Sequence, residues 1–134
     1  EMLRESCLCG RVAYEAEATV ETIAHCHCET CRKAHGAAFS SIASVPRDRL
    51  RWVQGEDLLS DYESSPGKVR RFCSACGSQL VAERDGSPNV MLRLGCLDTP
   101  ATAERQWHIW RSDGASWYDP GVAHPELAEG FPPA

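Results

Sequence analysis

Seven of the eight cysteines in this chain fall into three tight groups whose spacing is typical of metal ligands. The groups are a Cys-x-Cys pair, a Cys-x-Cys-x-x-Cys triplet and a Cys-x-x-Cys pair, at Cys7/Cys9, Cys26/Cys28/Cys31 and Cys73/Cys76. Cysteines two residues apart are badly placed to bridge each other as a disulfide. The spacing therefore favours zinc binding over a disulfide framework.

The two pairs together supply four thiolates, which fill the tetrahedral coordination of one zinc ion. Gly77 follows the later pair and can adopt the positive φ that closes a tight turn, and Gly10 likewise follows the first pair. Zinc with four sulfur ligands has no position left for a substrate, and such sites contribute about 10–16 kcal/mol in zinc-finger peptides. We therefore predict a structural zinc site on Cys7, Cys9, Cys73 and Cys76.

The triplet supplies only three thiolates, so a zinc ion there would keep one coordination position open, as catalytic zinc does. Three thiolates already outweigh the charge of the metal, and an incoming thiol suits so soft a site better than water does. A thiol bound there would be held as a thiolate at neutral pH. We therefore predict a second, catalytic type of zinc site on Cys26, Cys28 and Cys31, with a small thiol such as glutathione as the substrate.

The fourth ligand and the general base of this second site are left open by the sequence. His25 and His27 would point away from the cysteines of an extended segment. His35, one helical turn after the triplet, is the better candidate for a fourth ligand, although a surface histidine fits that position too. His35, Glu29 and Asp98 are the residues that we consider as a base.

The eighth cysteine, Cys96, stands alone after an expected strand. It is interpreted as a buried, inert thiol, in keeping with the usual behaviour of free cysteine. The alternative is that Cys96 approaches the open zinc site, where it would occupy the free position.

Composition narrows the class of protein. The chain has 134 residues, of which 43% are hydrophobic and 25% charged, as expected for one soluble domain. Its net charge of −5 argues against nucleic acid as a partner.

Arg32 and Lys33 could bind the carboxylates of a thiol substrate. The other short basic groups are interpreted as solvated surface, namely Arg49 with Arg51 and Lys68 with Arg70 and Arg71.

No apolar stretch approaches the roughly 20 residues that a membrane span requires. No signal peptide is recognisable ahead of the first cysteine. We therefore expect no membrane partner and a cytoplasmic location, where thiols stay reduced. The oligomeric state is not predicted.

The elements that must position the cysteines are mostly short strands with frequent turn signals. Alternating segments predict strands over residues 11–18, 21–26, 39–45, 49–53, 58–62 and 69–72, a hairpin of 79–82 with 89–94, and a strand over 107–110. One helical turn is expected over 29–35, ended by Gly36. The chain is predicted to be a single mainly β domain over 1–134, with a core of about 3–118 and an irregular tail after Tyr118.

The order of the motifs C-x-C, C-x-C-x-x-C-R-K, R-F-C-x-x-C-G-S and G-x-L-D resembles the glutathione-dependent formaldehyde-activating enzymes, a family that includes centromere protein V. The resemblance extends from about Cys7 to Trp117. It implies a β-tent-like fold of short antiparallel strands with the two zinc ions assigned above. It also implies a carbon–sulfur lyase that joins formaldehyde to glutathione, giving S-(hydroxymethyl)glutathione.

Two positions depart from the family pattern. Cys96 stands where serine is usual, and Ser116 precedes Trp117 where proline is common. Two other functions are considered beside the enzyme. One is a non-catalytic zinc-binding module for a protein or small thiol, and the other is nucleic-acid binding through zinc ribbons, which the acidic net charge disfavours.

Overall fold

The computed structural model describes residues 1–133, which contain ten strands and one α-helix. The smaller sheet has the order β1 (Met2–Ser6), β2 (Ala13–Glu17), β5 (Leu50–Gln54). The larger sheet has the order β10 (Arg105–Ile109), β3 (Thr22–Cys26), β4 (Ser40–Pro46), β9 (Asn89–Arg93), β8 (Gln79–Arg84), β7 (Lys68–Cys73), β6 (Leu59–Ser65). The helix α1 (Glu29–His35) connects β3 to β4. The predicted mainly β fold is confirmed.

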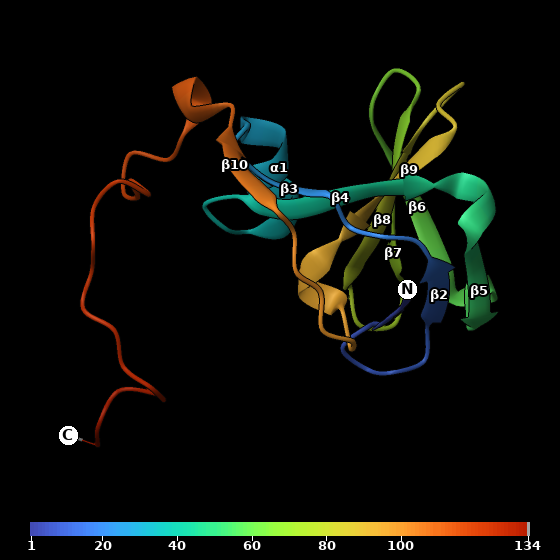
Figure 1. Cartoon of the computed structure of the whole chain (residues 1–134), viewed down its shortest axis with the longest axis horizontal. Coiled ribbons are helices and arrows are strands. Elements are labelled where there is room, and N and C mark those ends of the chain that lie inside the picture. Colours follow the sequence, from blue (N-terminus) through green and yellow to red (C-terminus); the bar gives the residue numbers. More distant parts are fainter. Residues whose placement is uncertain (134) are drawn as a thin grey trace.

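The hydrophobic core lies between the two sheets. Leu3 and Tyr14 from the smaller sheet belong to the same buried cluster as Val45, Val90 and Leu92 from the larger one. Strands β1 and β2 alternate between buried and more exposed residues, as expected for a sheet with one face on the core. In Figure 1, β2 and β5 lie on one side of the molecule, while α1, β3 and β10 lie together on the other.

Strand β1 was not predicted from the sequence. Leu3 and Glu5 both point inward and are buried, Glu5 with an exposed fraction of only 1%. A buried glutamate interrupts the alternation of apolar and polar residues by which a strand is recognised, and so the sequence does not reveal this strand. Strand β1 brings the first cysteine pair to the edge of the core.

The strands are antiparallel as predicted, apart from one pair: β10 runs parallel to β3, with Arg105 opposite Thr22 and Ile109 opposite Cys26. The connection between β3 and β10 runs from His27 to Glu104, far longer than the dozen or so residues that a parallel pair requires. The predicted helical turn and hairpin are confirmed. Residues 118–133 form no helix or strand, as predicted, and Figure 1 shows them running away from the sheets.

Residues 1–133 also contain four short 3-10 turns, which lie next to strand ends. They are Arg47–Arg49, Glu56–Leu58, Leu94–Cys96 and Arg111–Asp113. The only α-helix in this part of the chain has 7 residues, far too few to cross a bilayer.

Candidate functional site

The two cysteine pairs meet in space as the sequence predicts, and we call them the first cluster: Cys7, Cys9, Cys73 and Cys76. Their sulfurs all lie within 4.8 Å of one another, with 3.5 Å between Cys7 and Cys9 and 3.9 Å between Cys9 and Cys73. Four zinc–sulfur bonds of about 2.3 Å at tetrahedral angles place sulfurs about 3.8 Å apart. All eight cysteines of the chain are free thiols. The donor set and spacing of the first cluster therefore fit zinc.

Two similar turns build the first cluster. The amide of Gly10 donates to the carbonyl of Cys7 at 2.9 Å, and the amide of Gly77 donates to that of Cys73 at 2.7 Å. Both glycines have positive φ, +80° and +81°, a conformation that residues with a side chain rarely adopt. The chain thus reverses immediately after each pair, and the two sulfurs of a pair lie within 4.8 Å of each other.

Hydrogen bonds hold the sulfurs of the first cluster in place. The amide of Val12 donates to Cys7 Sγ at 3.3 Å, and Ser78 Oγ lies 3.3 Å from Cys76 Sγ. The Ser78 hydrogen bonds lower the pKa of Cys76 to about 5. Since a thiolate is the form that binds metal, these contacts suit Cys76 to that role.

The cysteine triplet also comes together, and we call it the second cluster: Cys26, Cys28 and Cys31. Cys26 ends β3, Cys28 is the N-cap of α1 and Cys31 lies in the first turn of that helix. The three sulfurs lie within 4.8 Å of one another, and the amide of Cys31 donates to Cys28 Sγ at 3.3 Å. No fourth ligand from residues 1–133 joins this group. Its three donors fit a zinc ion with one position left for another ligand.

Two buried arginines stand next to the second cluster, and sequence reasoning missed both. Arg70 and Arg93 are only 2% and 4% exposed, and Nη2 of Arg70 donates to Cys31 Sγ at 3.7 Å. Burial, and then the charge of Arg70, lower the pKa of Arg93 to about 10, so that it stays cationic at neutral pH. Nε and Nη1 of Arg70 and Nε and Nη2 of Arg93 have no hydrogen-bond partner within the described chain.

The charges at the second cluster are unbalanced in a way that points to an anionic ligand. With a divalent metal bound, the three thiolates would carry three negative charges, and the metal and the two arginines together would carry four positive ones. One further negative charge, such as that of a substrate thiolate, would neutralise the site. Because charges are costly to bury unless paired, this arrangement favours an anion over water in the open position.

His25 and His27 lie away from the second cluster, as predicted. Nδ1 and Nε2 of His25 are each 2.9 Å from a partner, Ser41 Oγ and Gln106 Oε1. Nε2 of His27 lies 2.8 Å from Nδ1 of His108. Both side chains therefore make hydrogen bonds to residues of β4 or β10 and do not join the three sulfurs.

The expectation that His35 is the best fourth ligand is wrong, because His35 does not join the three sulfurs within 4.8 Å. Its ring lines a hollow together with Arg93, and its Nε2 is buried without a hydrogen-bond partner. Burial, and then the charges of Arg93 and Arg70, lower the pKa of His35 to about 4. His35 is therefore a neutral imidazole at pH 7.

Cys96 lies beside the first cluster, so the alternative that it approaches the second is wrong. It packs against the buried group that contains Cys7 and Cys73, and its Sγ donates to the carbonyl of Gln79 at 3.3 Å. Burial, and then the charge of Glu5, raise the pKa of Cys96 to about 11. The inert thiol is the interpretation that fits, although Cys96 is only partly buried.

The remaining candidate side chains do not gather at the second cluster. Lys33 pairs with Glu29 at 3.5 Å on the exposed side of α1, and Nε of Arg32 donates to a backbone carbonyl at 3.3 Å. Asp98 accepts a hydrogen bond of 2.6 Å from Ser6, next to β1. None of these four candidates lines the cavity that opens beside Cys28.

That cavity has a volume of about 240 Å³. Its walls are Cys28, Thr30, Ser64, Ser65, Lys68, Arg70, Arg84, Trp110 and Asp113. Cys28 is the most exposed sulfur of the second cluster, so a ligand in this cavity has access to it. Lys68 and Arg70 could have been suspected from their alternation along β7, but we interpreted them as solvated surface.

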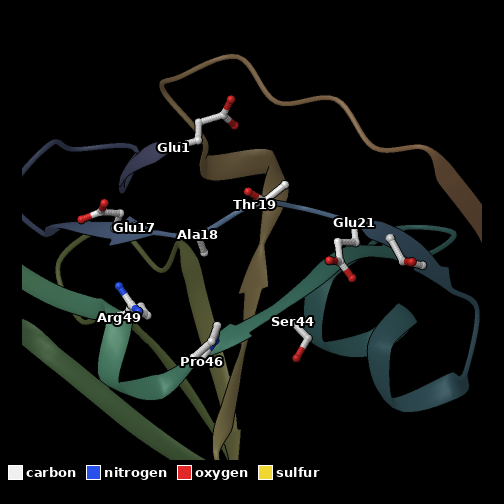
Figure 2. A pocket seen from close by; sticks show the side chains of 9 residues that line it. Glu1, Glu17, Ala18, Thr19, Glu21, Ser44, Pro46 and Arg49 are labelled. Atoms are coloured by element: carbon white, nitrogen blue, oxygen red, sulfur yellow. The ribbon is translucent and has the colours of Figure 1, made fainter.

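A larger hollow, of about 600 Å³, lies elsewhere, near the start of the chain (Figure 2). Its charged walls are Glu1, Glu17, Glu21 and Arg49. It contains neither a sulfur nor an imidazole, and so it offers no nucleophile or soft metal ligand. The groups suited to chemistry therefore lie at the second cluster and not in the larger hollow.

Fold and donor sets together define a small β protein with two sulfur-rich sites suited to zinc. The family described as "Glutathione-dependent formaldehyde-activating enzyme" matches residues 2–113. This chain therefore belongs to the family of glutathione-dependent formaldehyde-activating enzymes, as the motifs indicated.

Individual relatives agree with this family. A protein of Podospora anserina, named as a candidate enzyme of this family, is 37% identical over 78 residues, or 55% of this chain and 36% of that protein. One of Aspergillus flavus with the same name is 26% identical over 132 residues, or 95% of this chain and 63% of that protein. The chain thus spans less than two thirds of the length of either relative.

A solved structure from Rhodobacter sphaeroides shares the fold. It superimposes with a TM-score of 0.60 at 24% identity, covering 78% of this chain and 98% of that one. At this level of identity the likeness concerns the fold alone.

Proposed function

We propose that this protein is a zinc-dependent carbon–sulfur lyase of the S-(hydroxymethyl)glutathione synthase type, which activates a glutathione-like thiol towards formaldehyde or a related small electrophile. One observation carries the proposal. The second cluster gathers three sulfurs without a fourth ligand from the described residues, next to two buried arginines that each have two nitrogens without a hydrogen-bond partner in that part of the chain.

Cys26, Cys28 and Cys31 would hold the catalytic zinc ion, and Cys7, Cys9, Cys73 and Cys76 the structural one. Zinc bound at the second cluster would lower the pKa of a substrate thiol and so supply the nucleophile. Arg70 and Arg93 favour the anionic form of the substrate, because each is buried and cationic. Their effect is to attract the thiolate and to keep it close to Cys28.

The chemistry that follows is an addition. The substrate sulfur attacks the carbonyl carbon of formaldehyde, a carbon–sulfur bond forms, and the π bond of the carbonyl breaks. The proton released by the thiol is taken up by the carbonyl oxygen, so that the product is the S-hydroxymethyl adduct. The protein's contribution is to hold the thiolate in one place and one protonation state.

The test is adduct formation from formaldehyde and glutathione, followed by NMR for the wild type, Cys28→Ser and Cys96→Ser. We expect the wild type and Cys96→Ser to exceed the spontaneous rate, and Cys28→Ser to fall to it. A wild-type rate equal to the spontaneous rate would reject the proposed enzymatic activity. If glutathione still bound with one molecule per chain, a non-catalytic thiol-binding module would be the better description.

A further inference from the structure

Three cations share one wall of the cavity beside Cys28. Lys68 and Arg70 are two residues apart on β7 and therefore point to the same face of the sheet. Arg84 on β8 is directly opposite Lys68 in the register of the two strands. All three side chains line this cavity.

These cations lack acidic partners. Within residues 1–133, neither Lys68, Arg70 nor Arg84 makes an ion pair within 4.0 Å, although seven other pairs are present in that part of the chain. Like charges placed directly opposite each other across two strands destabilise a sheet. Burial, and then the charge of Arg70, lower the pKa of Lys68, as expected for a cation held among others. An anion is therefore the missing partner.

The rest of the cavity suits a small anionic group. Asp113 is the one carboxylate among its described walls, so positive charges outnumber negative ones. Arg70 is 2% exposed and carries two nitrogens without a hydrogen-bond partner, which marks a polar group built to receive a ligand. A volume of about 240 Å³ is enough for one arm of a small molecule but not for a nucleotide.

We propose that Lys68 and Arg84 bind a carboxylate of the thiol substrate while its sulfur lies at the second cluster. This inference rests on the proposed function and specifies it further: the substrates are small thiols that carry a carboxylate. Charge-assisted hydrogen bonds from lysine and arginine to a carboxylate supply both affinity and orientation. The residues that select the substrate thus come from β7 and β8, not from Arg32 and Lys33 on α1.

The test is calorimetric titration of the zinc-loaded protein with three thiols: glutathione, mercaptopropionate and mercaptoethanol. The first two carry a carboxylate and the third does not. The variants are Lys68→Met and Arg84→Met, and Arg105→Met is the matched control, since Arg105 is an exposed strand cation that does not line the cavity. Far-UV circular dichroism checks that each variant is folded.

We expect each cavity variant to bind glutathione and mercaptopropionate ~10-fold more weakly than the wild type, which is the effect of one lost charge-assisted hydrogen bond. Mercaptoethanol should change less than ~2-fold, and Arg105→Met should bind all three thiols as the wild type does. If the cavity variants lost affinity for mercaptopropionate but not for glutathione, the cavity would bind simple mercapto acids. The carboxylate site would then be upheld, with a different thiol as its substrate.

Two other results would overturn it. Unchanged binding of both carboxylate thiols to Lys68→Met and Arg84→Met would contradict the carboxylate site and leave the thiol site intact. Failure of all three thiols, mercaptoethanol included, to bind the wild type would contradict the proposed function itself, and the carboxylate site with it.

Discussion

The two sulfur clusters differ in how they meet the rest of the protein. The first draws its four sulfurs from two turns far apart in the sequence, and its hydrogen bonds come from backbone amides and Ser78. The second draws three sulfurs from six consecutive residues and has Arg70 and Arg93 beside it. The first cluster thus joins distant segments, whereas the second is locally formed and surrounded by positive charge.

Under the proposed function, this difference separates a structural role of the first cluster from a reactive role of the second. A metal with four thiolates joining two distant segments contributes to folding directly, because it closes a long loop of the chain. A locally formed site closes no such loop, and so its composition can serve binding. The predictions below test this contrast, beginning with the largest effect.

Cys73→Ser should destabilise the fold by more than about 5 kcal/mol, comparable with the whole stability of a small domain, since it removes a ligand of the first cluster. Cys28→Ser should leave the fold intact, because serine is also a good N-cap for α1. Urea unfolding followed by circular dichroism, with zinc measured by elemental analysis, compares the two. Equal loss of stability in both variants would remove the distinction between the clusters.

Arg70→Met should weaken glutathione binding by more than ~10-fold, because it removes a buried charge next to Cys31. Its fold should survive, because Arg70 makes no ion pair with a carboxylate of the described residues, so that methionine leaves no buried carboxylate without its partner. Titration calorimetry on zinc-loaded protein measures the affinity. The control is Arg71→Met on the same strand, whose side chain pairs with Asp61 at 3.0 Å. A similar loss in Arg71→Met would argue against a specific role for Arg70.

The neutral state of His35 predicts a pH dependence of stability. The pKa of His35 is lowered from 6.5 to about 4, so its contribution is present above pH 6.5 and is lost as the pH falls towards 4. Between pH 6.5 and 5 the wild type should lose ~1.5 kcal/mol more than His35→Gln does. Urea unfolding of both proteins at several pH values gives this difference. If the free energy of unfolding fell equally with pH in both proteins, burial beside Arg93 and Arg70 would not lower the pKa of His35.

Cys96→Ser should have the smallest effect and lower the free energy of unfolding by less than about 1 kcal/mol, because serine can make the same hydrogen bond to the Gln79 carbonyl. Both its zinc content and its thiol affinity should equal those of the wild type. A drop in thiol affinity would place Cys96 at the second cluster after all. This variant also serves as the cysteine control for the other substitutions.

The sequence predicted the parts of the site that depend on short spacing. The Cys-x-x-Cys turns, the triplet and α1 are each formed within a few residues, so their geometry follows from local conformational rules. The pairing of Cys7 with Cys73 was also predictable, because four sulfurs complete one zinc site.

The electrostatic surroundings of the second cluster could not be predicted in this way. Arg70 and Arg93 are 23 positions apart by number and lie two strands apart, on β7 and β9. Whether an arginine in a strand faces solvent or the interior depends on which strand comes next to it, and pairing between distant segments is not encoded locally. The parallel contact of β10 with β3 was missed for the same reason.

The most direct test of the open second cluster is cadmium NMR of protein loaded with cadmium at both sites, recorded before and after addition of glutathione. We predict two resonances, of which the four-sulfur one stays fixed while the other moves towards it as a fourth sulfur binds. If neither resonance moves at saturating glutathione, or if both already report four sulfurs beforehand, the account of an open thiol site is contradicted.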